Sequence, residues 1–232
     1  MKMARAAADN LAQFLYSVPL FSDLSQSSLD ILAQTGRLQQ FDRGDFIFYQ
    51  VDRADAAYVV RSGSVAIVLT NQDGREFIIN EMRPRDCFGE LALLTSQPRS
   101  TAAVAREKCE ILVIGRQVFL SVLDNDPRLS RRLLEITADR LASSSERESA
   151  MAFLDATARL ARVLLQMDQQ ESERGYVTTS QEELAQRTGL TRQTVAKTMG
   201  QWRRRGWLVT GRGRIMLLDR HALQNLSDQS GE

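Results

Sequence analysis

The chain has 232 residues, of which 43% are hydrophobic and 25% are charged, the balance of a globular protein long enough for two domains. Two cysteines and one histidine are too few for a disulfide scaffold, a multi-histidine metal site or a cysteine-held iron–sulfur cluster, and they disfavour most enzyme classes. We therefore expect no catalytic site and no metal. The net charge of +1 gives no indication of a nucleic-acid partner by itself.

The sequence shows neither a membrane span nor an export signal. No stretch approaches the roughly 18 to 20 apolar residues that a membrane-spanning helix needs. The first ten residues lack the apolar core of a secretory signal. We therefore expect a cytoplasmic protein with no membrane partner.

The first half of the chain changes from a helical to a β-rich pattern. Short helices are predicted up to about Leu38, with Ser25 placed to cap one of them. Short β-rich runs then alternate with turns that contain glycine, aspartate or proline. The runs span residues 46–49, 58–60, 65–70, 77–80 and 111–114. Strands at this spacing predict a small antiparallel sandwich or roll.

A long helical region follows. Asp126 and Pro127 suit a helix start, and no glycine or proline follows until Gly175, so we expect a break, with Asp155 as the candidate position. Residues three and four apart form a coiled-coil-like seam, which consists of Leu134, Thr137, Leu141, Ser144, Glu148 and Met151. The seam favours dimerisation, with packing on the chain's own sheet as the alternative. Seam hydroxyls are unfavourable unless hydrogen-bonded, and a ligand is one such partner.

The last part of the chain predicts a winged helix. Ser180 caps a helix over residues 181–187, a tight turn follows at residues 188–190, and Thr191 caps a second helix from Arg192 to about Arg205. Two extended runs, residues 207–209 and 214–218, flank the glycine-rich residues 211–213 and predict a hairpin. A helix-turn-helix followed by such a hairpin is a winged helix.

Charge is divided along the chain. Residues 1–155 carry 18 basic and 21 acidic residues, whereas residues 156–232 carry 12 basic and 8 acidic residues. From Leu184 to Leu218 there are eight basic residues and no acidic one. This asymmetry points to a nucleic-acid-binding end, with a solvated basic face as the alternative. We expect an α+β protein with boundaries at 1–125, 126–155 and 156–232.

Residues 88–102 combine groups that suit a sugar phosphate. Gly89 lets backbone N–H groups approach a ligand, and Leu91 begins a short helical turn whose N-terminus favours an anion. Glu90 can accept from a sugar hydroxyl, Arg99 is a fork for a phosphate, and Ser100 adds a hydroxyl. The alternative is a glycine turn with a surface ion pair.

The run Phe88-Gly89-Glu90-Leu91-Ala92-Leu93, followed by Pro98-Arg99-Ser100-Thr101-Ala102, resembles the phosphate-binding cassette of cyclic-nucleotide-binding domains. The resemblance continues through residues 152–155 into the helix-turn-helix and points to the CRP/FNR group of transcription regulators. It implies a jelly-roll-like β-roll sensor at 1–125, a long dimerisation helix at 126–155 and a winged helix-turn-helix at 156–232. It also implies a cytoplasmic homodimer that binds double-stranded DNA, with RNA polymerase as a further partner.

The same resemblance implies a role for each residue of the nucleotide site. Glu90 would bind the ribose 2′-hydroxyl, and Arg99 would pair with the cyclic phosphate. Arg140 would lie near the nucleotide, and Ser144 and Ser145 would reach the purine, one from each subunit. The full set is Ile79, Met82, Phe88, Gly89, Glu90, Leu91, Ala92, Arg99, Ser100, Thr101, Arg140, Ser144 and Ser145.

The expected effector is cyclic AMP, with cyclic GMP as an open alternative. The family usually has threonine where Ser144 stands. Serine keeps the hydroxyl but loses a methyl group, and a hydroxyl can donate to the guanine carbonyl as well as accept from the adenine amine. Preference between the two nucleotides is therefore not settled by this position.

The predicted DNA-binding residues lie on the second helix, before it and on the wing. Arg192 matches the arginine that grips a guanine edge in the family. Gln193 stands where glutamate is usual and Lys197 where arginine is usual, so the operator is expected to differ at the base pair that Gln193 faces. The full set is Gln181, Thr191, Arg192, Gln193, Thr194, Lys197, Arg212 and Arg214.

Two other hypotheses remain open. In one, the protein has the same fold but binds DNA constitutively or answers a different effector, so that the cassette is structural. In the other, the protein is a cyclic-nucleotide-dependent regulator of an enzyme and does not bind DNA. The basic stretch without acidic residues argues against this second hypothesis. Arg203, Arg204 and Arg205 either meet phosphate or complement the helix dipole.

Overall fold

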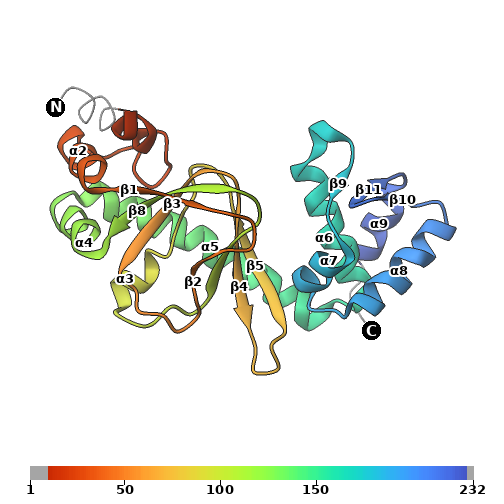
Figure 1. The fold of residues 1–232 in the computed structure, drawn as a ribbon. Helices are drawn as coiled ribbons and strands as arrows, with labels where there is room; N and C mark the ends of the chain where they lie inside the picture. Colours follow the sequence, from red (N-terminus) through yellow and green to blue (C-terminus); the bar gives the residue numbers. More distant parts are fainter. Residues whose placement is uncertain (1–9, 229–232) are drawn as a thin grey trace. The chain divides into compact units, whose positions relative to one another are not determined.

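The computed structural model describes residues 10–228 (Figure 1), and the chain divides between Arg140 and Leu141 into two compact units. The long helix α5 (Pro127–Phe153) contributes its first half to the N-terminal unit and its second half to the C-terminal unit. No helix within residues 10–228 is long and apolar enough to cross a membrane.

The N-terminal unit holds two four-stranded antiparallel sheets. One has the strand order β1-β8-β3-β6 and the other β2-β7-β4-β5. The strands are β1 (Arg37–Phe41), β2 (Phe46–Phe48), β3 (Ala56–Ser62), β4 (Val65–Thr70), β5 (Glu76–Met82), β6 (Cys87–Phe88), β7 (Ala102–Ala105) and β8 (Cys109–Gly115). The predicted roll is confirmed, because all five β-rich runs lie on strands of these sheets.

Strands β1, β6 and β7 lie outside the five predicted β-rich runs. Strand β1 begins with four exposed residues, Arg37 to Gln40, so it lacks the alternation that marks a half-buried strand. Strand β6 has two residues, and β7 is rich in alanine, which has low β-propensity. These strands form because neighbours distant in sequence pair with them.

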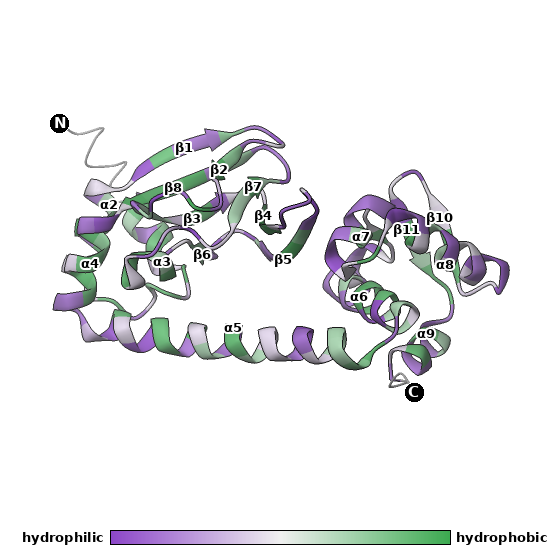
Figure 2. Ribbon diagram, turned by 90° about the horizontal axis from the view of Figure 1, so that it is seen from below, coloured by the Kyte–Doolittle hydropathy of each residue, from purple (hydrophilic) through white to green (hydrophobic). Residues whose placement is uncertain are grey.

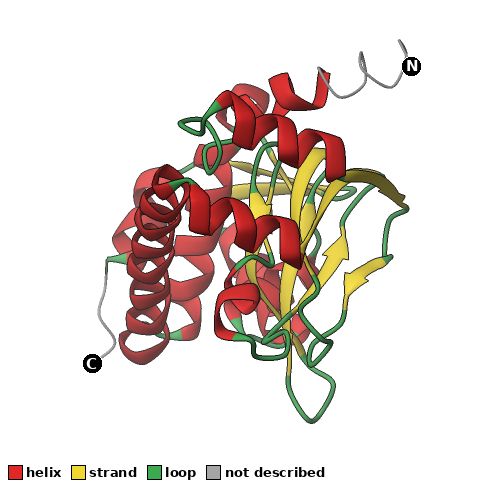
Figure 3. Ribbon diagram, turned by 90° about the vertical axis from the view of Figure 1, so that its left-hand side faces the viewer, coloured by secondary structure: helices red, strands yellow, loops and turns green. Residues whose placement is uncertain are grey.

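Helices lie against part of the roll in the N-terminal unit (Figure 3). The described chain opens in a helix that includes residues 10–16, and α2 (Gln26–Thr35), α3 (Leu91–Thr95) and α4 (Arg116–Asn125) follow. The Ser25 hydroxyl accepts from the Ser28 N–H, as predicted for the cap of α2. Helix α4 was not predicted.

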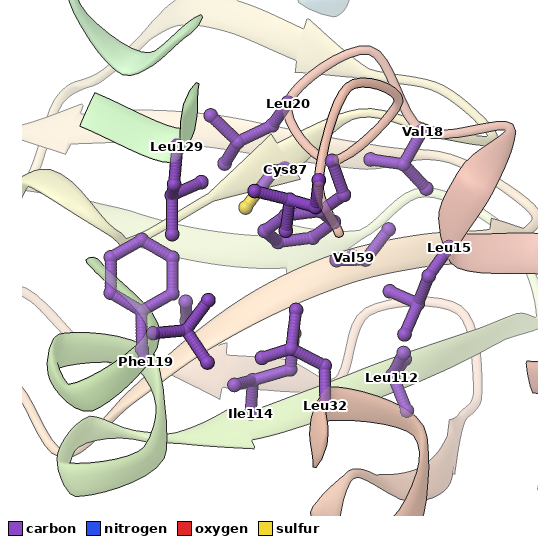
Figure 4. Packing of buried hydrophobic residues seen from close by; sticks show 14 of the residues in the cluster. Leu15, Val18, Leu20, Leu32, Val59, Cys87, Leu112, Ile114, Phe119 and Leu129 are labelled. Carbon is purple, nitrogen blue, oxygen red and sulfur yellow. The ribbon is translucent and has the colours of Figure 1, made fainter. Parts of the chain in front are cut away.

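The core of the N-terminal unit joins helices to the first sheet. Leu15 and Leu32 from the helices, Val59 and Ile114 from the sheet, and Phe119 from α4 are completely or almost completely buried together (Figure 4). A second cluster, around Phe48, Tyr58 and Phe88, fills the space between the two sheets. The cassette lies at the border of these clusters, because its strand β6 supplies Cys87 to the first and Phe88 to the second.

Helix α5 begins and ends where the sequence predicted. Asp126 accepts from the N–H of Arg128, two residues into the helix, and α5 ends at Phe153. Asp155 then caps α6 (Ala156–Gln170) by accepting from the Ala158 N–H at 2.7 Å. The predicted break at Asp155 is confirmed. Figure 2 shows α5 as one uninterrupted helix.

The C-terminal unit is a winged helix-turn-helix. It continues from α6 through a short 3-10 helix, η1 (Ser172–Arg174), β9 (Val177–Thr178), α7 (Gln181–Thr188), α8 (Arg192–Arg204), β10 (Leu208–Gly211), β11 (Arg214–Leu217) and α9 (Arg220–Ser227). Ser180 and Thr191 cap α7 and α8, as predicted. The hairpin of β10 and β11 is confirmed, and β9 adds an unpredicted third strand in the order β10-β11-β9. Trp202 of α8 is buried in the core of this unit.

Candidate functional site

The turn after β6 brings Gly89, in the first run of the cassette, close to the buried Arg99 of the second run. Gly89 has a φ of +76°, a backbone conformation that favours glycine. A Cβ atom at Gly89 would lie 2.9 Å from Arg99 Nη1 and 3.1 Å from Tyr58 Cδ2. Both the backbone conformation and the lack of space therefore require glycine here.

Glu90 is a buried carboxylate with one free oxygen. Its side chain is 1% exposed, and its Oε1 pairs with Nη1 of Arg140 from α5. Arg140 also donates through Nη2 to the Cys87 carbonyl at 2.6 Å. Glu90 Oε2 is buried and has no hydrogen-bond partner among the described residues. Burial raises the pKa of Glu90, and Arg140 opposes that rise.

Arg99 is also buried, and its charge is held by carbonyls and aromatic rings. It is 2% exposed and donates to the carbonyl oxygens of Gly89 at 2.5 Å and Ala56 at 2.6 Å. Its guanidinium lies 4.4 Å from the centre of the Phe48 ring and 5.4 Å from that of Tyr58. Its Nε is buried without a partner in the described chain. Burial raises the pKa of the neighbouring Tyr58 hydroxyl.

A cavity of about 190 Å³ lies beside the Glu90–Arg140 pair. Its lining includes residues from the N-terminal segment, from β5, from the turn before β6 and from α5. These are Pro19, Leu20, Asn80, Glu81, Met82, Arg85, Asp86, Cys87, Glu90, Ile136 and Arg140. Three of the predicted nucleotide-site residues, Met82, Glu90 and Arg140, thus meet at one cavity.

The remaining predicted nucleotide-site residues lie outside that lining. Phe88 is buried in the core, Leu91 and Ala92 belong to α3, and Gly89 precedes them. Ile79 on β5 and Thr101 are partly buried, and Ser100 is exposed. Arg99 reaches Gly89 but is not a lining residue. The free oxygen of Glu90 and the bonded state of Arg99 are features that the sequence did not indicate.

Ser144 and Ser145 belong to the C-terminal unit, in the second half of α5. Ser144 is partly buried, and its hydroxyl donates to Glu148 Oε1 at 3.3 Å; Ser145 is exposed. A polar partner for the Ser144 hydroxyl therefore exists on the same helix face. Their contact with a purine stays a prediction.

Helix α8 separates a buried face from an exposed one. Val195 and Met199 are buried in the core with Trp202, whereas Arg192, Gln193 and Lys197 are exposed. Within residues 10–228, the side chains of these three exposed residues have no hydrogen bond or ion pair. They form an exposed polar surface near the start of the helix.

The other predicted DNA-binding residues surround that surface. Gln181 and Thr191 are exposed at the starts of α7 and α8, and Thr194 is partly buried. The hydroxyls of Thr191 and Thr194 lie 2.9 Å apart. Arg212 and Arg214 are exposed at the tip and on the second strand of the wing, and Arg214 stacks on Tyr176.

No metal centre is present in the part of the chain that the structure describes, since no group of three or more potential ligands comes together between residues 10 and 228. Both cysteines are free and buried, as is common for small apolar residues. Burial raises the pKa of the Cys87 thiol well above its usual value, and Glu90 adds to the rise.

Sequence comparison defines the class of protein. Residues 38–126 match the cyclic nucleotide-binding domain, and residues 158–226 match the Crp-like helix-turn-helix domain. A roll with a buried carboxylate and arginine, joined to a winged helix-turn-helix, defines a cyclic-nucleotide-binding-domain transcription regulator. The chain belongs to the CRP/FNR family of transcription regulators.

Two curated relatives match almost the whole chain. The CRP-like cAMP-activated global transcriptional regulator of Mycobacterium tuberculosis is 30% identical over 217 residues, which cover 91% of this chain and 97% of the relative. The cyclic AMP receptor protein of Thermus thermophilus is 29% identical, over 90% of this chain and 96% of its own. Both are named as regulators or receptors rather than as enzymes, in agreement with the composition.

A solved structure shows the same architecture. FixK2 from Bradyrhizobium japonicum is 25% identical, with a TM-score of 0.73, over 84% of this chain and 99% of its own. The predicted α+β fold, with roll, long helix and winged helix, is confirmed.

Proposed function

We propose that this protein is a homodimeric, DNA-binding transcription regulator whose allosteric effector is cyclic AMP. The observation that carries the proposal is Glu90, a 1% exposed carboxylate with an unpartnered oxygen that lines a cavity. A buried carboxylate oxygen without a hydrogen bond is unfavourable. A ribose hydroxyl donates the hydrogen bond that this oxygen lacks.

The surrounding residues suit the rest of a cyclic nucleotide. Arg99 carries the positive charge that a cyclic phosphate requires. A bound phosphate would replace the Gly89 or the Ala56 carbonyl as the hydrogen-bond acceptor of Arg99. Met82 gives the cavity an apolar side. The hydroxyls of Ser144 and Ser145 would meet the base, in competition with the bond from Ser144 to Glu148.

DNA binding would use both halves of the winged helix. Arg192, Gln193 and Lys197 on α8 would enter the major groove, with Arg192 on a guanine edge. Gln181, Thr191, Arg212 and Arg214 would contact phosphates and fix the register. In a homodimer the two recognition helices would read a palindromic operator in major grooves about 34 Å apart. RNA polymerase would be the further partner.

Calorimetric titration with cyclic AMP and cyclic GMP, followed by operator DNA, tests the proposal. The wild-type protein is expected to bind cyclic AMP more tightly than cyclic GMP, and DNA more tightly with nucleotide present. Glu90→Gln removes the charge of the acceptor and should weaken nucleotide binding about 10-fold or more. Glu107→Gln, in an exposed loop of the same unit, is the matched control. Equal affinities for both nucleotides would overturn cyclic AMP as the specific effector.

One observation favours a different function for the cassette. The terminal nitrogens of Arg99 already bond to Gly89 and Ala56, and its guanidinium lies on two rings, an arrangement that a purely structural arginine would also adopt. The protein would then bind DNA constitutively or answer a different effector. Absence of heat with both nucleotides, together with unchanged DNA affinity, would establish this alternative.

A further inference from the structure

Some arginines of the C-terminal unit pair with a carboxylate, and two others lie on aromatic rings. Arg174, Arg187 and Arg220 each pair with a carboxylate of the same unit. Arg205 and Arg214 instead lie on aromatic rings. The Arg214 guanidinium is 4.7 Å from the centre of the Tyr176 ring, and that of Arg205 is 4.9 Å from the centre of the Trp207 ring.

The two kinds of partner leave an arginine in different states. A carboxylate neutralises the guanidinium and occupies its N–H groups. An aromatic face attracts the cation without neutralising it and leaves the N–H groups at the edge of the plane available. Within residues 10–228, the side chains of Arg205 and Arg214 have no hydrogen bond or ion pair to another residue. Both arginines therefore keep full charge and five donors while their orientation is restricted.

The ring under Arg214 comes from the residue that precedes a neighbouring strand. Arg214 begins β11 and is paired in register with Thr178 of β9. Tyr176 directly precedes β9, two residues before Thr178, and its ring reaches Arg214. The three-stranded sheet thus places the arginine and the ring together. Strand β9, which the sequence did not predict, supplies the connection.

We propose that Tyr176 is a positioning residue that holds Arg214 ready for a DNA phosphate, and that Trp207 does the same for Arg205. This inference rests on the DNA binding proposed above and adds two residues to it. Arginine loses rotamer freedom when it binds a phosphate, and restriction before binding reduces that loss. The ring raises affinity for every DNA sequence alike, since a phosphate contact carries no base information.

A nucleic acid fits this surface better than an acidic protein does. The stretch from Leu184 to Leu218 contains eight basic residues and no acidic one, and it includes the recognition helix and both strands of the hairpin. Arg205 follows the last residue of α8, and Arg214 lies on the wing, so both belong to the elements that flank a bound groove. The regularly spaced phosphates of a nucleic acid would contact both of these separated cations.

A double-mutant cycle on the full-length protein tests the role of Tyr176. Affinity is measured by fluorescence anisotropy over a series of salt concentrations with saturating cyclic AMP. The probes are a duplex selected by the protein from random DNA and a scrambled duplex. Tyr176→Leu should weaken binding to both probes about two- to five-fold, the range that an exposed cation–π contact supports. Its salt slope should not change, because Arg214 keeps its charge.

The remaining variants separate positioning from structure. Arg214→Ala should weaken both duplexes and reduce the salt slope by about one. In that background Tyr176→Leu should have no further effect, and Tyr176→Phe, which keeps the ring, should bind like the wild type. Arg174→Ala removes an arginine that pairs with Glu171 and is the matched control. Thermal unfolding of each variant confirms that it is folded, and Tyr176→Thr replaces Tyr176→Leu if the latter unfolds.

Distinct results would overturn distinct claims. If Tyr176→Leu weakens DNA binding equally with and without Arg214, the ring acts through the fold and the positioning role is wrong. If Arg214→Ala leaves DNA affinity and salt slope unchanged, Arg214 faces a different partner, such as an acidic protein surface. If the wild-type protein binds neither duplex, the proposed function itself is wrong, and this inference falls with it.

Discussion

Val51 adopts a backbone conformation that its side chain disfavours, at a position that holds the cassette arginine. Its φ is +69°, in the left-handed region that β-branched residues rarely adopt. The Val51 N–H donates to the Arg99 carbonyl, and the Arg99 N–H donates to the Asp52 carbonyl, both at 2.8 Å. The strained residue is therefore part of the turn that fixes the backbone of Arg99.

We expect Val51→Gly to stabilise the protein by about 1 kcal/mol, because relief of left-handed strain exceeds the entropy that glycine adds to the unfolded chain. Val51 is 78% exposed, so little packing is lost. Urea unfolding measures the change. Arg53→Gly, at an exposed neighbour without a positive φ, should instead destabilise by about 0.5 to 1 kcal/mol. A loss of stability in Val51→Gly would contradict the strain argument.

The sequence predicted the identity of the two charged cassette residues but not their contacts. Glu90 and Arg99 could be identified from the cassette motif, because the motif consists of residue types and spacings within one short stretch of sequence. Arg99 bonds to Ala56 and lies on Phe48 and Tyr58, which come from two other strands. Aromatic residues in β-rich runs are ordinary core candidates, so no local pattern marks them as partners of an arginine.

At the scale of elements, helix boundaries that depend on a few neighbouring residues were predicted correctly. Ser25, Ser180 and Thr191 were predicted at helix starts and Asp155 at a helix break, and each accepts a hydrogen bond from an N–H of the helix that follows it. Strand β1 is polar and exposed, and it pairs with β8, which is distant in the sequence. Its formation therefore depends on a tertiary contact that a short stretch of sequence does not reveal.

Asp126 joins three elements of the N-terminal unit. It is the residue between α4 and α5, it is 3% exposed, and it accepts from the Ser25 N–H and from the hydroxyls of Ser25 and Ser28 at the start of α2. Arg128 completes the set at 2.8 Å. The Arg128 guanidinium and these donors hold the pKa of Asp126 well below its ordinary value.

We expect Asp126→Asn to lower the free energy of unfolding by about 2 to 3 kcal/mol at pH 7, since bonds to a charged acceptor are lost. A carboxyl whose pKa is lowered in the folded state contributes stability above its unfolded pKa, about 3.9, and loses it as the pH falls through the folded value. The difference between wild type and variant should therefore shrink below about pH 4.

Urea unfolding at pH 7, 4 and 3 provides the measurement. Asp73→Asn, a matched change in the exposed turn between β4 and β5, controls for a general loss of negative charge. If the wild-type advantage over Asp126→Asn is the same at pH 3 as at pH 7, the charge of Asp126 is not what joins α2 to the helix corner.

At the scale of the whole molecule, the near-neutral charge is a sum of unlike parts. Residues 1–155, which include the roll and the long helix, carry a net charge of −3. Residues 156–232, which include the winged helix, carry a net charge of +4. A roll that binds one small ligand needs no net positive charge, whereas a domain that binds the DNA backbone does. The placement of charge along the chain was therefore more informative than its total.

Helix α5 carries the apolar surface that a homodimer would bury. Leu134 and Leu141, seven residues apart and so on one face of the helix, are 73% and 67% exposed, and Met151 of the same seam is 45% exposed. Leu133, one position from the seam, is buried in the chain's own core. One side of the helix thus packs on its own unit, and the seam side is exposed, as the proposed homodimer requires.

We expect the double variant Leu134→Glu and Leu141→Glu to be monomeric, because two like charges per helix would face each other across the seam. Sedimentation equilibrium should give twice the 26.1 kDa chain mass for the wild type and the single chain mass for the variant. Ile31→Glu, at a 49% exposed apolar residue on α2, should remain dimeric.

Both leucines are exposed in the single chain, so the variant should keep its helical circular dichroism and its affinity for one half-site while losing tight binding to the palindrome. A dimeric Leu134→Glu, Leu141→Glu variant would show that the subunits associate elsewhere, and a monomeric wild type would remove the geometric basis for a palindromic operator.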